Sequence, residues 1–261
     1  MEIEIDLNKT LEQNAAIYFE KSKLAKRRIA GLQIAIGKQE EKKAREKPLM
    51  EKISSDRKTR WYEKYRWFFT SDNFLVIGGK SASANEEVVK KYMKKEDVYF
   101  HADVFGAPHC VIKVSEKKDA KSVPEQSMKE AASFAVTFSK AFEQGISFED
   151  AYSVKPDQVS KRAPSGTSMG TGAFMIYGER NYFKKSPISI AIGLHQKERV
   201  LMSGPASAVK KWCNPFFELR QGNIEKNDCA KLLKTKFAEK GLEFTNEDIL
   251  SLLPNGKFDL K

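Results

Sequence analysis

The stretch from residue 60 to residue 114 most constrains what this chain can fold into. It opens with six aromatic residues in the nine positions 61–69, interspersed with basic side chains. An apolar run over residues 74–77 follows and ends at Gly78 and Gly79. Residues 98–114 alternate in polarity, turn near Gly106 and return through a second apolar run, which is typical of a β-hairpin. We therefore expect the core here, with strands of one sheet and about two-thirds of the aromatic cluster buried.

Length and composition limit the class of protein. A chain of 261 residues with 41% hydrophobic and 31% charged residues can bury a core beneath a strongly solvated surface. No apolar run reaches the roughly 20 residues of a membrane helix, and the acidic N-terminus lacks the apolar centre of a secretion signal. The three cysteines are far apart, which argues against a disulfide scaffold or structural zinc site and fits a reducing interior. We therefore expect a cytoplasmic protein without a membrane partner.

The net charge of +11 is concentrated on one segment. Residues 1–20 carry five acidic side chains and one basic, whereas residues 21–60 carry fourteen basic and five acidic. A concentrated positive field attracts phosphate backbones. The alternative is a lysine-rich helix face that only keeps the protein soluble.

Three domains are expected: a helical arm over residues 1–59, a core over 60–203 and a small α-rich module over 204–261. Thr10 and Gln13 fit a capping box that opens the arm, preceded by either a short edge strand or an irregular lead-in over residues 1–9. The arm's apolar stripe follows the 4/3 spacing of a coiled coil from Tyr18 to Ile36. Pro48 ends this helix. A second helix over residues 49–69 is predicted to pack back along it as a helical hairpin.

The remaining elements predict an α+β fold with a mixed, largely antiparallel sheet and packed helices. Ser83 and Glu86 fit a second capping box, and a buried helix is expected over residues 122–145. Residues 153–172 contain five glycines and prolines and are predicted to be irregular. Further strands are expected over 173–177, 188–194, 199–202 and 216–219, and further helices over 206–211, 225–239 and 246–253.

Two stretches carry residues that are typical of chemical sites. His101, Asp103 and His109 are the residue types that bind zinc or iron, but we favour a polar pair, His101 and Asp103, that hydrogen-bonds RNA or braces residues 60–67. The glycine-rich loop 165–172 lacks the spacing of a nucleotide-binding loop, and its basic flanks favour contact with an RNA backbone instead. No serine or cysteine lies beside a histidine and an acid in a nucleophile motif.

The chain resembles the NFACT-R domain and adjoining coiled coil of the NEMF/RqcH family of ribosome-associated quality-control factors, in its archaeal form. The resemblance rests on the residues 61–67 (WYEKYRW), 71–79 (SDNFLVIGG), 85–86 (NE), 101–103 (HAD), 106–108 (GAP), 158–161 (QVSK), 164–166 (PSG), 172–176 (GAFMI) and 178–182. These motifs follow the family's order across about 120 residues, so the match is specific. Residues 14, 15 and 18 are similar to the start of the family's coiled coil, and residues 203–205 and 253–256 to archaeal tails.

The resemblance implies binding to the large ribosomal subunit that carries an obstructed nascent chain and tRNA, and support of template-free C-terminal tailing. Three departures are visible. The family's large N-terminal domain is missing from this sequence, the coiled coil is short, and Ser81 stands where the family has an acidic residue. We expect RNA binding to be retained and tailing to need more than this chain.

We therefore predict a non-catalytic RNA- and ribosome-binding module without a cofactor. Its partners would be rRNA of the large subunit, tRNA and, through the arm, ribosomal proteins or a ubiquitin-ligase-like protein. The alternatives are a metal-assisted nuclease or hydrolase that uses His101, Asp103 and His109, and a protein-interaction scaffold without RNA contact. The residues predicted to bind RNA are Lys26, Arg27, Arg28, Arg60, Trp61, Lys64, Arg66, His101, Asp103, Gln158, Lys161, Arg162 and Arg180.

Overall fold

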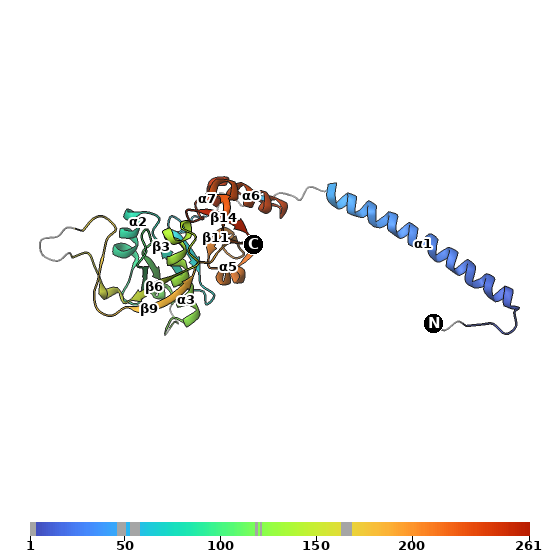
Figure 1. Ribbon diagram of the computed structural model, residues 1–261, viewed down its shortest axis with the longest axis horizontal. Coiled ribbons are helices and arrows are strands. Elements are labelled where there is room, and N and C mark those ends of the chain that lie inside the picture. Colours follow the sequence, from blue (N-terminus) through green and yellow to red (C-terminus); the bar gives the residue numbers. More distant parts are fainter. Residues whose placement is uncertain (1–3, 46–50, 53–57, 118–119, 121, 163–168) are drawn as a thin grey trace. The chain divides into compact units, whose positions relative to one another are not determined.

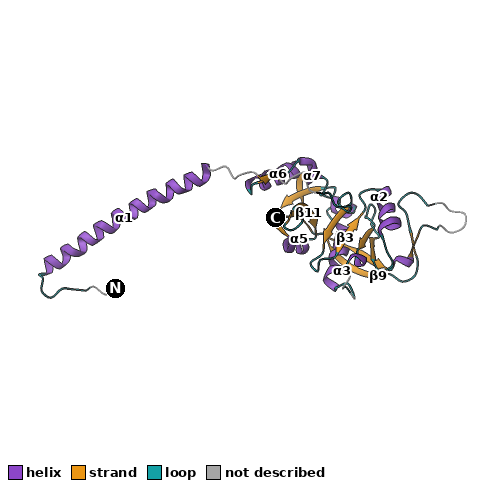
Figure 2. Ribbon diagram, turned by 180° about the vertical axis from the view of Figure 1, so that it is seen from behind, coloured by secondary structure: helices purple, strands orange, loops and turns teal. Residues whose placement is uncertain are grey.

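The structure is a computed structural model that describes residues 4–45, 51–52, 58–117, 120, 122–162 and 169–261. Contacts within the chain define two compact units, Met1–Leu49 and Met50–Lys261 (Figure 1). The described part of the first unit contains one helix, and that of the second contains both larger sheets and the remaining helices (Figure 2). Each unit is therefore described by itself.

The first unit consists of helix α1 (Leu11–Arg45) and the residues before it. The predicted capping box is confirmed, because the Thr10 amide donates to Gln13 Oε1 at 3.0 Å and the Gln13 amide donates to Thr10 Oγ1 at 3.3 Å. Both contacts satisfy backbone N–H groups that the start of a helix leaves unpaired. The predicted helix therefore begins where the sequence places its cap.

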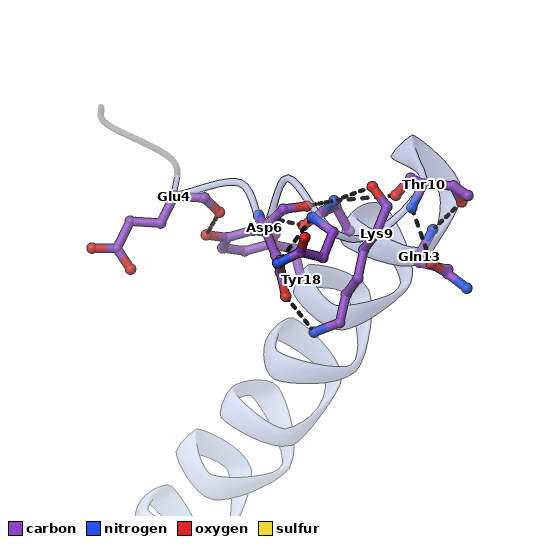
Figure 3. A network of polar contacts seen from close by, with 8 residues as sticks. Glu4, Asp6, Lys9, Thr10, Gln13 and Tyr18 are labelled. Carbon is purple, nitrogen blue, oxygen red and sulfur yellow. Dashed lines mark hydrogen bonds and ion pairs between the residues drawn. The ribbon is translucent and has the colours of Figure 1, made fainter.

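The segment before α1 folds back over the first turns of the helix (Figure 3). The Asn14 side chain accepts from the Asp6 amide at 2.9 Å and donates to the Asp6 carbonyl at 3.0 Å. The Tyr18 hydroxyl donates to the Glu4 carbonyl at 2.6 Å. Because a side chain satisfies the Asp6 backbone and residues 4–9 form no strand, this segment is the irregular lead-in rather than the edge strand.

The prediction that the hairpin has a second helix is wrong over the residues that the structure describes. Residues 61–64 form turns, and Arg66–Phe69 is strand β2. Further upstream, Glu51–Lys52 is the short strand β1, which pairs in parallel with β13 (Leu242–Glu243); residues 49–50 and 53–57 lie outside the described part. Aromatic residues favour strands when a partner strand is present, and β3 (Leu75–Gly78) supplies that partner.

The second unit is built on a six-stranded sheet in the order β2-β3-β5-β4-β6-β9, with every neighbouring pair antiparallel. Its strands β4 (Val98–Ala102) and β5 (Cys110–Ile112) form the hairpin that the sequence predicts. Two edge-side strands, β6 (Phe148–Val154) and β9 (Asn181–Pro187), were not predicted. The α+β fold with antiparallel strands is confirmed.

Helices and short strands cover the two faces of this sheet. The buried helix α3 (Glu125–Thr137) packs on the face that carries Phe100 and Ala151. The opposite face carries Tyr99 and Tyr152, which pack with Val89 of the π-helix η1 (Val88–Tyr92). The paired strands β7 (Val159–Ser160) and β8 (Met175–Ile176) cover the same face. Alternate residues of one strand thus serve different layers.

Several element ends differ from the prediction. Helix α2 (Ala82–Glu87) is capped by Ser81, which accepts from the Ala84 amide at 3.2 Å, so Ser83 is not the cap. The helix expected over residues 122–145 divides at residues 138–139 into α3 and α4 (Lys140–Glu143), with 3-10 turns η2 (Val114–Glu116) and η3 (Pro156–Gln158) elsewhere. The region 153–172 includes the end of β6 and all of β7.

A second, four-stranded antiparallel sheet has the order β11-β10-β12-β14. Its strands are β10 (Ile190–His195), β11 (Val200–Gly204), β12 (Cys213–Glu225) and β14 (Lys257–Leu260), and its helices are α5 (Ala206–Trp212), α6 (Lys226–Glu239) and α7 (Asn246–Leu250). The second sheet meets the first at β2, where the Phe69 amide lies 3.4 Å from the Met202 sulfur of β11. Beside this contact, the Trp212 indole of α5 donates to the carbonyl of Thr70, directly after β2, at 2.8 Å. A Cβ at Gly204 would lie 2.9 Å from the Phe68 ring, so the absence of a side chain at residue 204 permits this approach.

The domain boundaries at 59/60 and 203/204 stay predictions. The contacts divide the chain after Leu49, and the second sheet pairs strands from both sides of residue 204. In the described part of the chain, no helix has both the length and the apolar character needed to cross a membrane.

Replacing Asp97 by alanine should strongly destabilise the second unit. The Asp97 carboxylate is fully buried, pairs with the buried Lys113 ammonium and accepts from the amides of Lys94 at 2.8 Å and Ser115 at 2.9 Å. Removing one partner leaves a buried charge unpaired, so the free energy of unfolding in urea should fall by about 3–5 kcal/mol. Asp228→Ala, which breaks the exposed pair with Lys231, is the control and should cost less than about 1 kcal/mol. Equal losses in the two variants would contradict the argument.

Candidate nucleic-acid interface

The first turn of α2 lies directly against Gly79, the residue that follows β3. A Cβ built on Gly79 would lie 2.0 Å from Asn85 Oδ1 and 2.5 Å from the Asn85 amide nitrogen. Only a residue without a side chain permits this approach. Asn85 Oδ1 then accepts from the His109 amide at 3.1 Å, at the start of β5. Gly79 of the Gly-Gly motif and Asn85 of the Asn-Glu motif are therefore in direct contact.

Glu86 connects α2 to the residues that flank the glycine-rich loop. Its carboxylate accepts from Lys161 Nζ at 3.0 Å and from the Gly172 amide at 2.9 Å. The Lys90 ammonium, the Gly172 amide and the Lys161 ammonium lower the pKa of Glu86 to about 2. Gly172 has a φ of +76°, and a Cβ there would lie 2.5 Å from the Ala82 carbonyl oxygen. The loop's anchors are therefore fixed to α2; residues 163–168 lie outside the described part.

Gln158 and Lys161 use their polar atoms within the protein. Gln158 Nε2 donates to the carbonyls of Tyr177 and Glu179, each at 2.8 Å. Lys161 Nζ also donates to the Gly170 carbonyl at 2.8 Å. These contacts hold the segment 170–179 in place, so both side chains shape the loop region. Arg162, in contrast, is exposed.

One face of the six-stranded sheet presents a row of aromatic and polar side chains, which we call the sheet-face cluster: His101, Asp103, Tyr152, Arg180 and Tyr182. His101 pairs with Tyr152 across β4 and β6, and Tyr152 pairs with Tyr182 across β6 and β9. The Arg180 guanidinium lies 4.4 Å from the centre of the Tyr152 ring and pairs with Asp103 at 2.9 Å. Tyr182 is 46% exposed, so the cluster offers a ring to solvent, beside an arginine that is half-buried and paired with Asp103.

His101 of this cluster and its neighbour His109 stay uncharged at neutral pH. Their rings stack with 4.4 Å between centroids. Burial, and then the neighbouring His101, lower the pKa of His109 to about 3, and burial also lowers the pKa of His101. His101 Nδ1 lies 3.2 Å from the Pro108 carbonyl oxygen, which only accepts, so Nδ1 carries the proton. Nε2 of His101 is therefore a hydrogen-bond acceptor.

These groups do not converge as metal ligands. Asp103 pairs with Arg180, and His109 Nδ1 is bonded to the Tyr99 hydroxyl at 2.5 Å. Within the described residues, no group of three or more histidine, cysteine, aspartate or glutamate side chains is arranged to hold a metal ion. Within the described residues, no hydrogen bond or ion pair joins His101 or Asp103 to residues 60–67. His101 is instead bonded to the Pro108 carbonyl, and Asp103 is paired with Arg180.

The aromatic segment is mainly core, as predicted. Four of its six rings are buried, namely Tyr62, Tyr65, Trp67 and Phe68, whereas Trp61 is 37% exposed. Trp61 stacks on Tyr92 with centroids 4.4 Å apart.

The basic residues of this segment differ in their surroundings. Arg60 pairs with Glu198 at 3.2 Å and Lys64 with Glu87 at 2.8 Å, so both charges are partly compensated. Arg66 is half-buried on the α3 side of the sheet, over the Phe138 ring. It is therefore on the face opposite His101.

Lys26, Arg27 and Arg28 belong to the first unit. All three side chains are exposed on α1. Successive residues of a helix are rotated by about 100°, so these cations spread around roughly half of the helix circumference. Within the described residues, none of them forms an ion pair.

Two members of the sheet-face cluster, Tyr152 and Tyr182, were missed by sequence reasoning. Both lie on the unpredicted strands β6 and β9. The available signal was the alternation over residues 148–154, where Ala151 faces α3 and Tyr152 faces the cluster. The row exists only once the register of three strands is known, so single residues in the sequence do not reveal it.

Comparison with known proteins gives a consistent family match. Residues 64–178 match the family model described as NFACT protein RNA binding domain. The chain is 39% identical over 210 residues to the archaeal Rqc2 homolog aRqcH of Methanocaldococcus jannaschii. The aligned residues cover 80% of this chain and 30% of that protein.

Two animal relatives are also similar. The ribosome quality control complex subunit NEMF homolog of Drosophila melanogaster is 33% identical over 199 residues, covering 74% of this chain and 20% of the relative. The human ribosome quality control complex subunit NEMF is 40% identical over 134 residues, covering 51% of this chain and 12% of the relative. The chain thus spans less than a third of the length of each of these relatives.

The contact between Glu86 and the Gly172 amide should persist in mild acid. The pKa of Glu86 is lowered from its ordinary value of 4.5 to about 2 in the folded protein. The carboxylate therefore keeps its contact at pH values above 4.5 and loses it as the pH falls through about 2. The proton chemical shift of the Gly172 amide should therefore titrate with a midpoint near 2. Glu86→Gln should abolish this titration, whereas Glu87→Gln, which instead removes the partner of Lys64, should leave it unchanged. A midpoint near 4.5 in the wild-type protein would contradict the contact.

Proposed function

Because the chain belongs to the NEMF/RqcH family, we propose that it is the RNA-binding part of a ribosome quality-control factor. In this proposal it binds rRNA of the large subunit that carries an obstructed nascent chain and tRNA, in the cytoplasm and without catalysing a reaction itself. C-terminal tailing would belong to a longer assembly, because the chain corresponds to 30% or less of its compared relatives. The arm would contact ribosomal proteins or a ubiquitin-ligase-like partner.

The observation that carries this proposal is the sheet-face cluster. An exposed tyrosine beside an arginine is a stacking platform for an unpaired base, worth about 1–3 kcal/mol per base. His101 adds a fixed acceptor, which suits the 2′-hydroxyl donor that distinguishes RNA from DNA. Tyr182, Arg180 and His101 together thus offer stacking, charge and a hydrogen-bond acceptor in one place.

Basic residues around the cluster support the same proposal. Arg162, Lys184 and Lys185 are exposed, and within the described residues no carboxylate pairs with their side chains. Such cations favour binding to a phosphate backbone, because they release the counterions that are condensed on it. Gln158 and Lys161 have the different role of holding the segment that carries Arg180. Trp61, Arg60 and Lys64 would form a separate contact patch in this proposal.

Tyr182→Ala should weaken the binding of single-stranded RNA about 5- to 100-fold, which corresponds to the loss of one stacked base. The measurement is fluorescence anisotropy with a labelled oligonucleotide at several salt concentrations. Loss of a stacking contact should leave the salt dependence unchanged, whereas Arg180→Gln should reduce the slope of log K against log salt by about 0.7.

Phe148→Ala is the matched control, since Phe148 is a 57% exposed aromatic residue on β6 outside the cluster. It should leave RNA affinity unchanged, and a DNA strand of the same sequence should bind the wild-type protein more weakly. Equal wild-type affinity at 50 and 500 mM salt, or no binding at low salt, would refute the proposed function.

Reversing the charge of Lys26, Arg27 and Arg28 to glutamate should weaken co-sedimentation with large ribosomal subunits. The three exposed cations contribute through attraction to phosphates, so the loss should be greatest at low salt. Lys21→Glu combined with Lys23→Glu tests whether any positive charge on α1 suffices. Unchanged co-sedimentation of the triple variant would remove the arm from the RNA contact, and binding that survives RNase treatment of the subunits would assign the arm to a protein partner.

A further inference from the structure

Strand β9 forms one edge of the six-stranded sheet as far as the chain is described. A groove of about 650 Å³ follows this edge, because it is lined by every residue of β9 from Tyr182 to Pro187. The groove is also lined by five residues of α3: Glu125, Gln126, Lys129, Glu130 and Ser133. Tyr182 belongs to both the sheet-face cluster and this groove, so the two surfaces are continuous along β9.

A bulge close to Tyr182 carries two lysines that line the groove. The register of β9 against β6 shifts so that one residue, Asp150, lies opposite both Lys184 and Lys185. Lys185 has a φ of +51°, a left-handed conformation that is uncommon for a residue with a side chain. The Asp150 carboxylate accepts from the Lys185 amide at 2.7 Å and so holds the bulge in place. Bulges are frequent at sheet edges and beside functional sites, where they redirect side chains, and both lysines are exposed here.

The two bulge lysines give the groove its excess of positive charge. Within the described residues, neither of them forms an ion pair. Of the two acids in the lining, Glu125 pairs with Lys129 at 2.7 Å. The other, Glu130, is buried and accepts hydrogen bonds from neutral amide and hydroxyl groups. The lining thus carries three lysines against two glutamates, and the lysines without an acidic partner lie on β9.

An anionic strand fits this edge better than a peptide strand does. Lysines, a bulge and a proline are the means by which edge strands avoid pairing with another strand, and β9 has all three, ending at Pro187. A base that stacks on Tyr182, in contrast, brings a phosphate backbone with it. At about 3.3 Å per strand residue, Lys184 lies roughly 7 Å from Tyr182 and Lys185 roughly 10 Å, so both ammonium groups can reach the backbone next to that base.

Resting on the proposed function, we propose that the RNA strand leaves the base stacked on Tyr182 along the β9 edge. Lys184 and Lys185 hold its phosphates there, and the groove accommodates its backbone. The sheet-face cluster then binds a base, and the bulge binds the backbone on one side of that base. The protein thereby fixes the direction in which a single strand crosses the edge of the sheet.

The test uses the full chain and a short RNA in which only the central nucleotide carries a base, the other positions being abasic. The single base fixes which part of the backbone lies beside Tyr182. Neutral methylphosphonate linkages then replace the phosphates on either the 5′ or the 3′ side of that base. One of the two replacements should weaken binding to the wild-type protein about fivefold or more, the upper range for exposed ion pairs. The same replacement should cost the combined variant Lys184→Gln and Lys185→Gln nothing further.

Each single variant, Lys184→Gln and Lys185→Gln, should weaken binding of the unmodified RNA up to about fivefold at low salt and reduce the slope of log K against log salt by about 0.7. Lys234→Gln is the matched control, because Lys234 is an exposed lysine on α6 that forms no ion pair among the described residues. It should change neither quantity.

Lys185→Gly separates RNA contact from a role in the fold. Glycine adopts a positive φ without strain, so this variant should unfold at the same or a higher temperature, while its RNA affinity falls as it does in Lys185→Gln. Full RNA affinity in Lys185→Gly would overturn the proposal.

Two further results would overturn it. One is that the lysine variants bind RNA as Lys234→Gln does. The other is that the combined variant self-associates in sedimentation equilibrium and keeps its RNA affinity, because the lysines would then only prevent pairing of the β9 edge. If Tyr182→Ala still weakens RNA binding in either case, the proposed function stands without this path. If the wild-type protein binds no RNA, the proposed function itself fails.

Discussion

The close approach of helix α2 to Gly79, directly after β3, is the constraint on which the candidate interface depends. Gly79 allows Asn85 to reach the His109 amide, and the next residue, Glu86, then reaches the Gly172 amide. A β-carbon at residue 79 would overlap Asn85 and push the helix away from the sheet. Three segments that are distant in sequence therefore share one attachment point.

The neighbouring glycine has a corresponding role on the other face. A β-carbon at Gly78 would point toward Cys110 and Phe134, on the side covered by α3. Its absence lets the Cys110 and Phe134 side chains approach the strand, while Arg66, which pairs with Gly78 across β2 and β3, lies over Phe138. Because successive residues of a strand face opposite layers, two adjacent glycines make room for different groups: the first turn of α2 on one face, and the Cys110 and Phe134 side chains on the other.

Local sequence signals predicted the elements whose partners lie nearby, and they failed where distant strands decide. The capping box at Thr10 joins residues three positions apart, the hairpin over residues 98–114 joins residues at most 14 positions apart, and both were predicted. Strand β9 is mostly exposed and polar, so it has no apolar alternation and owes its conformation to pairing with β6. Residues 66–69 likewise become a strand because β3 lies beside them.

The same distinction applies to the basic side chains. Composition identifies Lys161 and Arg180 equally well, yet Glu86 and two backbone carbonyls engage the first, whereas the second pairs with Asp103 over the Tyr152 ring. Positive charge alone attracts any polyanion. Discrimination between RNA and other polyanions needs groups that charge does not specify, such as a ring for stacking and a neutral acceptor. Burial lowers the pKa of His101 next to Arg180, so the fold, rather than the charge pattern, would give this surface the means to select RNA in the proposed function.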